Sequence, residues 1–175
     1  MNATIILLSG DAVDLITWQR MYGLTVGSSQ IGRFFDIGEK SFRDGLTIAE
    51  PVIRFLDLVR VLWGKPININ SLDRSEEHQR KMQQTNPNAA KTSPHVVKLA
   101  ADIDTVSKED TFDLLEVIDD AIELLGYQVR IGWKKYMQRG DTFVHIDVCP
   151  MFYAIGKAWN YKEHPAVWRN TKGEW

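Results

Sequence analysis

Two stretches of the sequence each place a histidine and a carboxylate in or beside a short apolar run. Residues 93–104 read Ser-Pro-His-Val-Val-Lys-Leu-Ala-Ala-Asp-Ile-Asp, and residues 143–148 read Phe-Val-His-Ile-Asp-Val. Runs this apolar are normally buried, and buried polar groups need partners. A fold that buries both runs therefore has to pair these side chains, and we expect the two stretches to meet.

The second stretch has the alternation of a strand. Successive side chains of a strand point to opposite faces, so Phe143, His145 and Asp147 share one face while Val144 and Ile146 share the other. The apolar pair suits a core. The face with His145 is then available for a site.

The first stretch separates its histidine from its first aspartate by almost extended chain. His95 lies in the loop before the strand predicted for residues 99–103, and Asp102 lies near the end of that strand. A turn has to bring the two side chains together if they act at one site. Taken alone, this spacing also fits a surface histidine and an unrelated aspartate.

Imidazole and carboxylate groups are suitable zinc ligands, and a catalytic zinc usually has three protein ligands and an open fourth position. The single cysteine, Cys149, excludes a disulfide within the chain and a zinc knuckle built from several cysteines. We therefore predict that His95, Asp102 and His145 converge on one metal, with Zn2+ as the favoured ion.

The elements around these stretches indicate an α+β fold. Apolar periodicity predicts helices at residues 11–22, 48–63 and 108–125. Short strands are expected at residues 65–71, 99–103, 128–133 and 143–148, with a turn joining the last two. This order predicts a small, mainly antiparallel sheet with flanking helices. We expect one domain over residues 1–175, with a core at about 48–148, an N-terminal extension and an aromatic C-terminal tail.

Composition excludes several classes of partner. The formal net charge is -2, and no basic stripe indicates nucleic-acid binding. No apolar run is long enough for a membrane span, and the short run near the N-terminus lacks the basic residues of a signal peptide. We expect a protein that is cytoplasmic as made and binds neither nucleic acid nor membrane.

Further residues carry a family resemblance. The motif Ser-x-His-x-x-Gly-x-Ala-x-Asp is matched in register by Ser93, His95, Ala100 and Asp102. A second motif, Val-His-Ile-Asp-Val, is matched around His145 and Asp147. Over about residues 48–148 the chain resembles the zinc D-Ala-D-Ala carboxypeptidase-like metallopeptidases. That family includes bacterial D,D- and L,D-peptidases, phage endolysins and, more distantly, the hedgehog domain.

The resemblance implies roles for individual residues. His95, Asp102 and His145 would be the zinc ligands. Arg74, at the end of a segment that looks like the family's helix–strand segment, would polarise the scissile carbonyl or hold a substrate carboxylate. Ser93 would hydrogen-bond near the first ligand or the substrate. The plainer alternatives are a solvated arginine and a loop serine.

The chain departs from the family pattern at two positions. Lys98 stands where the family usually has glycine, and Thr142 stands where many relatives have an acid three residues before the second histidine. The candidates for the general base are Asp147 and, less favoured, Asp141. Asp147 has an alternative role, which is to orient His145.

By this resemblance the chain is a zinc metallopeptidase that hydrolyses amide bonds in peptidoglycan stem peptides, as a D,D- or L,D-carboxypeptidase or endopeptidase. By analogy a phage lysis enzyme is the expected context, with release to the cell wall by a lysis or virion route. One alternative is a non-catalytic zinc-binding structural or virion-associated module of the same fold. Another is a peptidase that uses the same site on a different substrate.

Overall fold

The structure, a computed structural model, describes residues 4–21, 30–31, 35–36, 47–86, 89 and 93–151. Most of the segment 23–45 and the aromatic tail from residue 153 onward lie outside the described residues. Helices and mainly antiparallel sheets make up the fold, so the predicted α+β class is confirmed.

The larger sheet has four strands in the order β6-β7-β9-β8, and every neighbouring pair is antiparallel. The strands are β6 (Asn68–Ser71), β7 (Ala100–Asp104), β9 (Phe143–Asp147) and β8 (Arg130–Gly132). Alternation gives the sheet two unlike faces. One face carries Ala101, Ile103, Ile131, Val144 and Ile146, all of which belong to the hydrophobic core.

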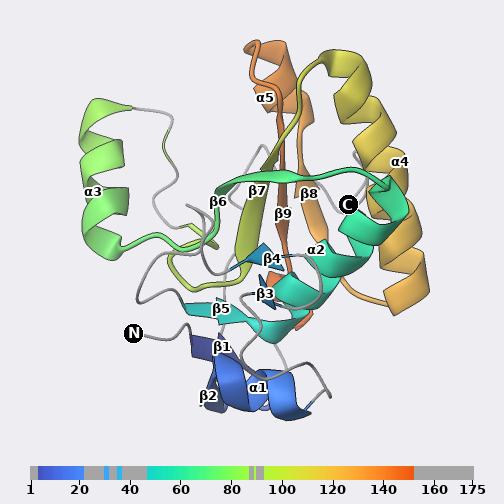
Figure 1. Ribbon diagram of the computed structural model, residues 1–175. Helices are drawn as coiled ribbons and strands as arrows, with labels where there is room; N and C mark the ends of the chain where they lie inside the picture. Colours follow the sequence, from blue (N-terminus) through green and yellow to red (C-terminus); the bar gives the residue numbers. More distant parts are fainter. Residues whose placement is uncertain are drawn as a thin grey trace.

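Helices α2 (Glu50–Trp63) and α4 (Lys108–Leu125) pack against each other beside this sheet (Figure 1). Local signals set their ends. Gly64 and Gly126 end the helices with φ values of 70° and 62°, which glycine adopts without strain. Ser107 accepts a hydrogen bond from the backbone N–H of Asp110 and so caps α4. The predicted C-terminal ends of both helices are confirmed.

A smaller sheet lies at the N-terminal end of the chain. Strand β1 (Thr4–Ile6) pairs antiparallel with β2 (Ala12–Asp14) and parallel with β5 (Thr47–Ala49). The helix predicted for residues 11–22 was therefore placed too early, because residues 12–14 pair with β1 and α1 (Leu15–Met21) begins only after them. Strands β3 (Gln30–Ile31) and β4 (Phe35–Asp36) form a separate antiparallel pair.

Two short helices complete the described fold. Helix α3 (Glu76–Thr85) follows β6 and stands apart from the larger sheet (Figure 1). Helix α5 (Lys134–Gln138) lies in the connection between β8 and β9, for which the sequence predicted only a turn. Among the described residues, no helix is long and apolar enough to cross a membrane.

Candidate metal centre

Asp102 and His145 lie directly opposite each other on neighbouring strands. The register of β7 and β9 pairs Asp102 with His145, on the sheet face that is turned away from the apolar core. Side chains opposed in this way start only ~5 Å apart at Cβ. The Oδ1 atom of Asp102 lies 2.8 Å from Nδ1 of His145.

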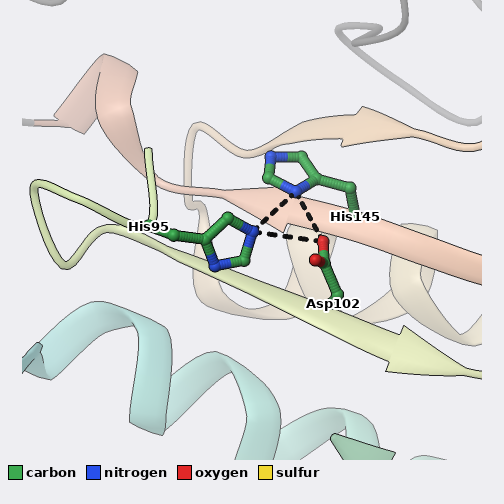
Figure 2. Close-up of side chains that lie close together, drawn as sticks. All are labelled: His95, Asp102 and His145. Carbon is green, nitrogen blue, oxygen red and sulfur yellow. Dashed lines mark hydrogen bonds and ion pairs between the residues drawn. The ribbon is translucent and has the colours of Figure 1, made fainter. Parts of the chain in front are cut away.

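His95 reaches the same point from the turn before β7. Three backbone N–H groups close this turn, with Val96 donating to Ser93, Lys98 to His95, and Leu99 to Pro94. The turn folds the chain back, so Nε2 of His95 lies 3.2 Å from Oδ1 of Asp102 and 3.3 Å from Nδ1 of His145 (Figure 2). The bend required by the sequence spacing is present.

The geometry of these three side chains fits a zinc site. A tetrahedral zinc with bonds of about 2.0–2.1 Å holds its ligand atoms ~3.3 Å apart. The three separations here are 2.8, 3.2 and 3.3 Å, with one carboxylate oxygen and two imidazole nitrogens as donors. A zinc ion held there supplies Lewis acidity, which activates water and polarises a carbonyl group.

The second ring nitrogen of His95 sets the tautomer of that ring. Nδ1 lies 2.9 Å from the backbone carbonyl oxygen of Leu72 and 3.5 Å from Oγ of Ser71. A carbonyl oxygen can only accept, so Nδ1 carries the proton and donates. The lone pair of Nε2 is thereby directed at the cluster, as a metal ligand requires.

Asp147 lies behind the other histidine. Its Oδ2 atom is 3.4 Å from Nε2 of His145, whereas Nδ1 of the same ring faces Asp102. The Asp147 carboxylate also accepts a hydrogen bond from Nε of Arg130 and one from the backbone N–H of Cys149. It is fully buried, and this position agrees with a role in orienting His145.

The electrostatics of the cluster favour an ionised carboxylate beside a protonated ring when no metal is bound. Burial alone would raise the pKa of Asp102, but the electrostatic interaction with His95 and the hydrogen bond with His145 outweigh it and lower that pKa. Burial alone would lower the pKa of His145, but the hydrogen bond to Asp102 and the Asp147 carboxylate 3.4 Å from Nε2 raise it to about 9. A metal bound at Nδ1 of His145 therefore displaces a proton.

Arg74 lies at the edge of the cluster. Its Nη2 atom is 4.0 Å from Oδ2 of Asp102. The guanidinium donates to Oε1 of Gln79 at 2.9 Å and to the hydroxyls of Ser93 and Ser71 at 3.4 Å. Arg74 and Ser93, which the resemblance singled out, thus lie near the three predicted ligands. The Ser93 hydroxyl accepts a hydrogen bond from Arg74, and Arg74 in turn lies beside Asp102.

The comparisons with known proteins agree with this geometry. A family model described as Peptidase M15 matches residues 35–147, more than half of the chain. The chain belongs to the peptidase M15 family. Peptidases of this family are zinc-dependent, and the matched region contains all three predicted ligands. No match to the chain is found among curated proteins, and none among solved structures.

The structure explains why the resemblance leads us to expect glycine at the position of Lys98. Lys98 has φ 68°, the left-handed region that favours glycine, and is the one non-glycine residue with positive φ in the part of the chain that the structure describes. Its ammonium group pairs with Asp73 and lies 3.4 Å from the carbonyl oxygen of Arg74. Lysine therefore ties the turn to the segment that carries Arg74.

Thr142 stands where the resemblance leads us to expect an acid, three residues before His145. The carbonyl oxygen of Thr142 accepts a hydrogen bond from the N–H of Thr105 at the end of the sheet. Asp141 is placed apart from the three ligands, since its half-exposed carboxylate pairs with Arg139 and borders a cavity of about 500 Å³ beside Asp104. Its role as a base stays a prediction.

Several residues of the centre escaped the sequence reasoning. They are Ser71 and Gln79, which hold Arg74, the carbonyl of Leu72, and Arg130 behind Asp147. A backbone carbonyl has no sequence signature. The alternation of β8 would have placed Arg130 on the same face as His145 only if the pairing of β8 with β9 had been known.

Proposed function

We propose that this chain is a zinc peptidase that hydrolyses an amide bond in peptidoglycan stem peptides. The observation that carries the proposal is the triangle formed by His95, Asp102 and His145, with the guanidinium of Arg74 beside it. Membership of the peptidase M15 family supports the peptidase class. The resemblance to cell-wall carboxypeptidases and endolysins supports the substrate.

Arg74 is the residue we assign to the substrate. Stem peptides carry free carboxylates, and a guanidinium binds a carboxylate through two parallel hydrogen bonds. Hydrogen bonds from Arg74 to Gln79 and to the two serines fix its orientation before substrate binds. Its side chain is 16% exposed, so it is reachable from one side of the cluster.

The residues around His145 divide the remaining tasks. Asp147 is buried and paired with Arg130, which suits an orienting carboxylate better than a base that exchanges protons with water. Asp141 is half-exposed and pairs with Arg139, and it is the remaining candidate base among the residues proposed from the sequence, although the structure places it apart from the three ligands.

The test is a digestion of purified murein by the zinc-loaded protein, with the products identified by mass spectrometry. We expect about one zinc per chain and release of D-alanine or stem-peptide fragments, and the masses identify the bond that is cut. Asp102→Ala serves as the metal-site control. Cleavage of free dipeptides without cleavage of murein would favour a peptidase with another substrate.

A second candidate function is a non-catalytic zinc-binding module of a virion or another assembly. Two observations favour it, namely the threonine at position 142 in place of an acid and the strained Lys98 in the metal-site turn. Under this alternative the protein binds one zinc, releases nothing from murein, and remains inactive when Asp141 is replaced.

A further inference from the structure

A buried ion pair lies directly behind the metal centre. Arg130 on β8 and Asp147 on β9 are partners in the strand register, and their side chains are 1% and 0% exposed. Two contacts join them: Nε of Arg130 donates to Oδ1 at 2.9 Å, and Nη2 lies 2.8 Å from Oδ2. The guanidinium thus contacts both oxygens of the carboxylate, and these two contacts fix the plane of the carboxylate.

Stability alone gives little reason for such a pair. Removing two charges from water costs several kcal/mol per ion, and a hydrophobic pair of similar volume is often as stable. Surface pairs of this protein avoid that cost, as with Lys81 and Glu77 on α3, whose side chains are each 72% exposed. The position of the buried pair relative to His145 suggests what it does.

The buried pair contacts His145, one of the three predicted metal ligands. Oδ2 of Asp147, the oxygen that faces Nη2 of Arg130, is 3.4 Å from Nε2 of His145. The opposite nitrogen of that ring, Nδ1, is the one that faces Asp102 and His95. A carboxylate beside Nε2 favours the tautomer with its proton there, which leaves the Nδ1 lone pair for a metal.

We propose that Arg130 is a positioning residue for the metal centre. It holds the Asp147 carboxylate in one plane, with Oδ2 beside Nε2 of His145, so that the ring keeps its proton at Nε2 and turns Nδ1 toward the other two ligands. This inference rests on the zinc site of the proposed function, but not on any substrate or on turnover. Arg130 therefore affects zinc binding through Asp147 and His145 rather than by contacting the metal.

The test compares Arg130→Met with Arg130→Lys, Asp147→Asn and the double variant Arg130→Met/Asp147→Asn. Arg80→Met is the matched control, since it makes the same exchange at an exposed residue of α3. Zinc affinity is measured by competition with a chelating dye. The tautomer of His145 is read from the 15N shifts of labelled histidine in the metal-free protein at a pH above the pKa of that ring, about 9, because zinc on Nδ1 would by itself leave the proton on Nε2. Thermal unfolding is followed separately.

We expect Arg130→Met and Asp147→Asn each to weaken zinc binding by about 10- to 100-fold, the usual effect of losing an outer partner of a ligand. The double variant should lose no more than Asp147→Asn alone, because the arginine acts through the aspartate. Arg130→Lys should restore part of the affinity, and Arg80→Met should leave it unchanged. The fraction of His145 protonated at Nε2 should fall only in the first two variants and their combination.

A purely structural pair gives a different pattern. If Arg130→Met lowers the unfolding temperature while the folded protein keeps the wild-type zinc affinity and His145 tautomer, the inference is overturned. If that variant does not fold, wild-type affinity and tautomer in Asp147→Asn overturn it equally. Murein cleavage is not a readout here, so the inference and the proposed activity can fail separately.

Discussion

Exchanging Lys98 for alanine and for glycine separates two opposing effects of this side chain on the metal-site turn. The backbone of Lys98 has φ 68°, which is unfavourable for any residue with a Cβ. Its ammonium group pairs with Asp73, whose other carboxylate oxygen accepts a hydrogen bond from the N–H of Thr47. Lys98→Ala removes the ion pair and keeps the strain, whereas Lys98→Gly removes both.

The magnitudes follow from these two contributions. The left-handed conformation costs a residue with a Cβ about 1–2 kcal/mol, which glycine avoids. Glycine also gives the unfolded chain more conformational freedom, and this lowers the stability of the folded protein by roughly 0.5–1 kcal/mol. The ion pair joins side chains that are 23% and 22% exposed. Screening by solvent limits it to roughly 1 kcal/mol at most. Lys98→Ala should therefore be the least stable of the three proteins, and Lys98→Gly should lie ~1 kcal/mol above it and close to the wild type.

Thermal unfolding of the metal-free proteins at one pH, followed by circular dichroism, measures these differences. A change of 1 kcal/mol in a chain of this size moves the midpoint by about 2–4 °C. Asp73→Asn, alone and combined with Lys98→Ala, isolates the ion pair as a coupling free energy. If Lys98→Ala proves as stable as Lys98→Gly, the backbone argument is wrong. A coupling free energy of zero would show that the ion pair between Lys98 and Asp73 does not stabilise the protein.

The other predictions concern the metal, the substrate and the thiol. His95→Ala, Asp102→Ala and His145→Ala should each lose most of the zinc, because removing a ligand costs more than the about 10- to 100-fold lost with an outer partner; full occupancy by elemental analysis in all three variants would sink the assignment. Treatment with a chelator should abolish murein cleavage, and added zinc should restore it; cleavage that persists in zinc-free protein contradicts a zinc peptidase. Arg74→Ala should keep zinc and lose about 10²-fold or more in turnover, as expected for a lost electrostatic donor, and unchanged turnover on murein would refute its role. Cys149 is fully buried, and burial raises the pKa of its thiol, so iodoacetamide should label it only in unfolded protein; rapid labelling of the folded protein, seen by mass spectrometry, would contradict this.

Local sequence signals predicted much of this fold. The serine cap of α4 and the glycines that end α2 and α4 act through hydrogen bonds and φ values within a few residues of the helix end, so they can be read directly from the chain. The alternation in β9 placed His145 and Asp147 on one face for the same reason. The spacing of His95 and Asp102 was not enough by itself, and the prediction of all three members of the cluster depended also on the flanking residues that carry the family resemblance.

Pairing between distant segments decided what the sequence left open. Residues 12–14 form a strand rather than the start of a helix because β1 lies beside them. The turn at residues 93–98 accepts a lysine with positive φ because Asp73, remote in sequence, pairs with its ammonium group.

The clearest case is Arg130. In the sequence it is one of 21 lysines and arginines, and the short run around it says only that a strand is favoured. The pairing of β8 with β9 places it behind Asp147 and removes both side chains from water. Sequence alone thus identified which groups can bind a metal, because ligand chemistry belongs to residue types. The tertiary structure decided which nitrogen of His145 faces the site, because that depends on neighbours brought in by the sheet.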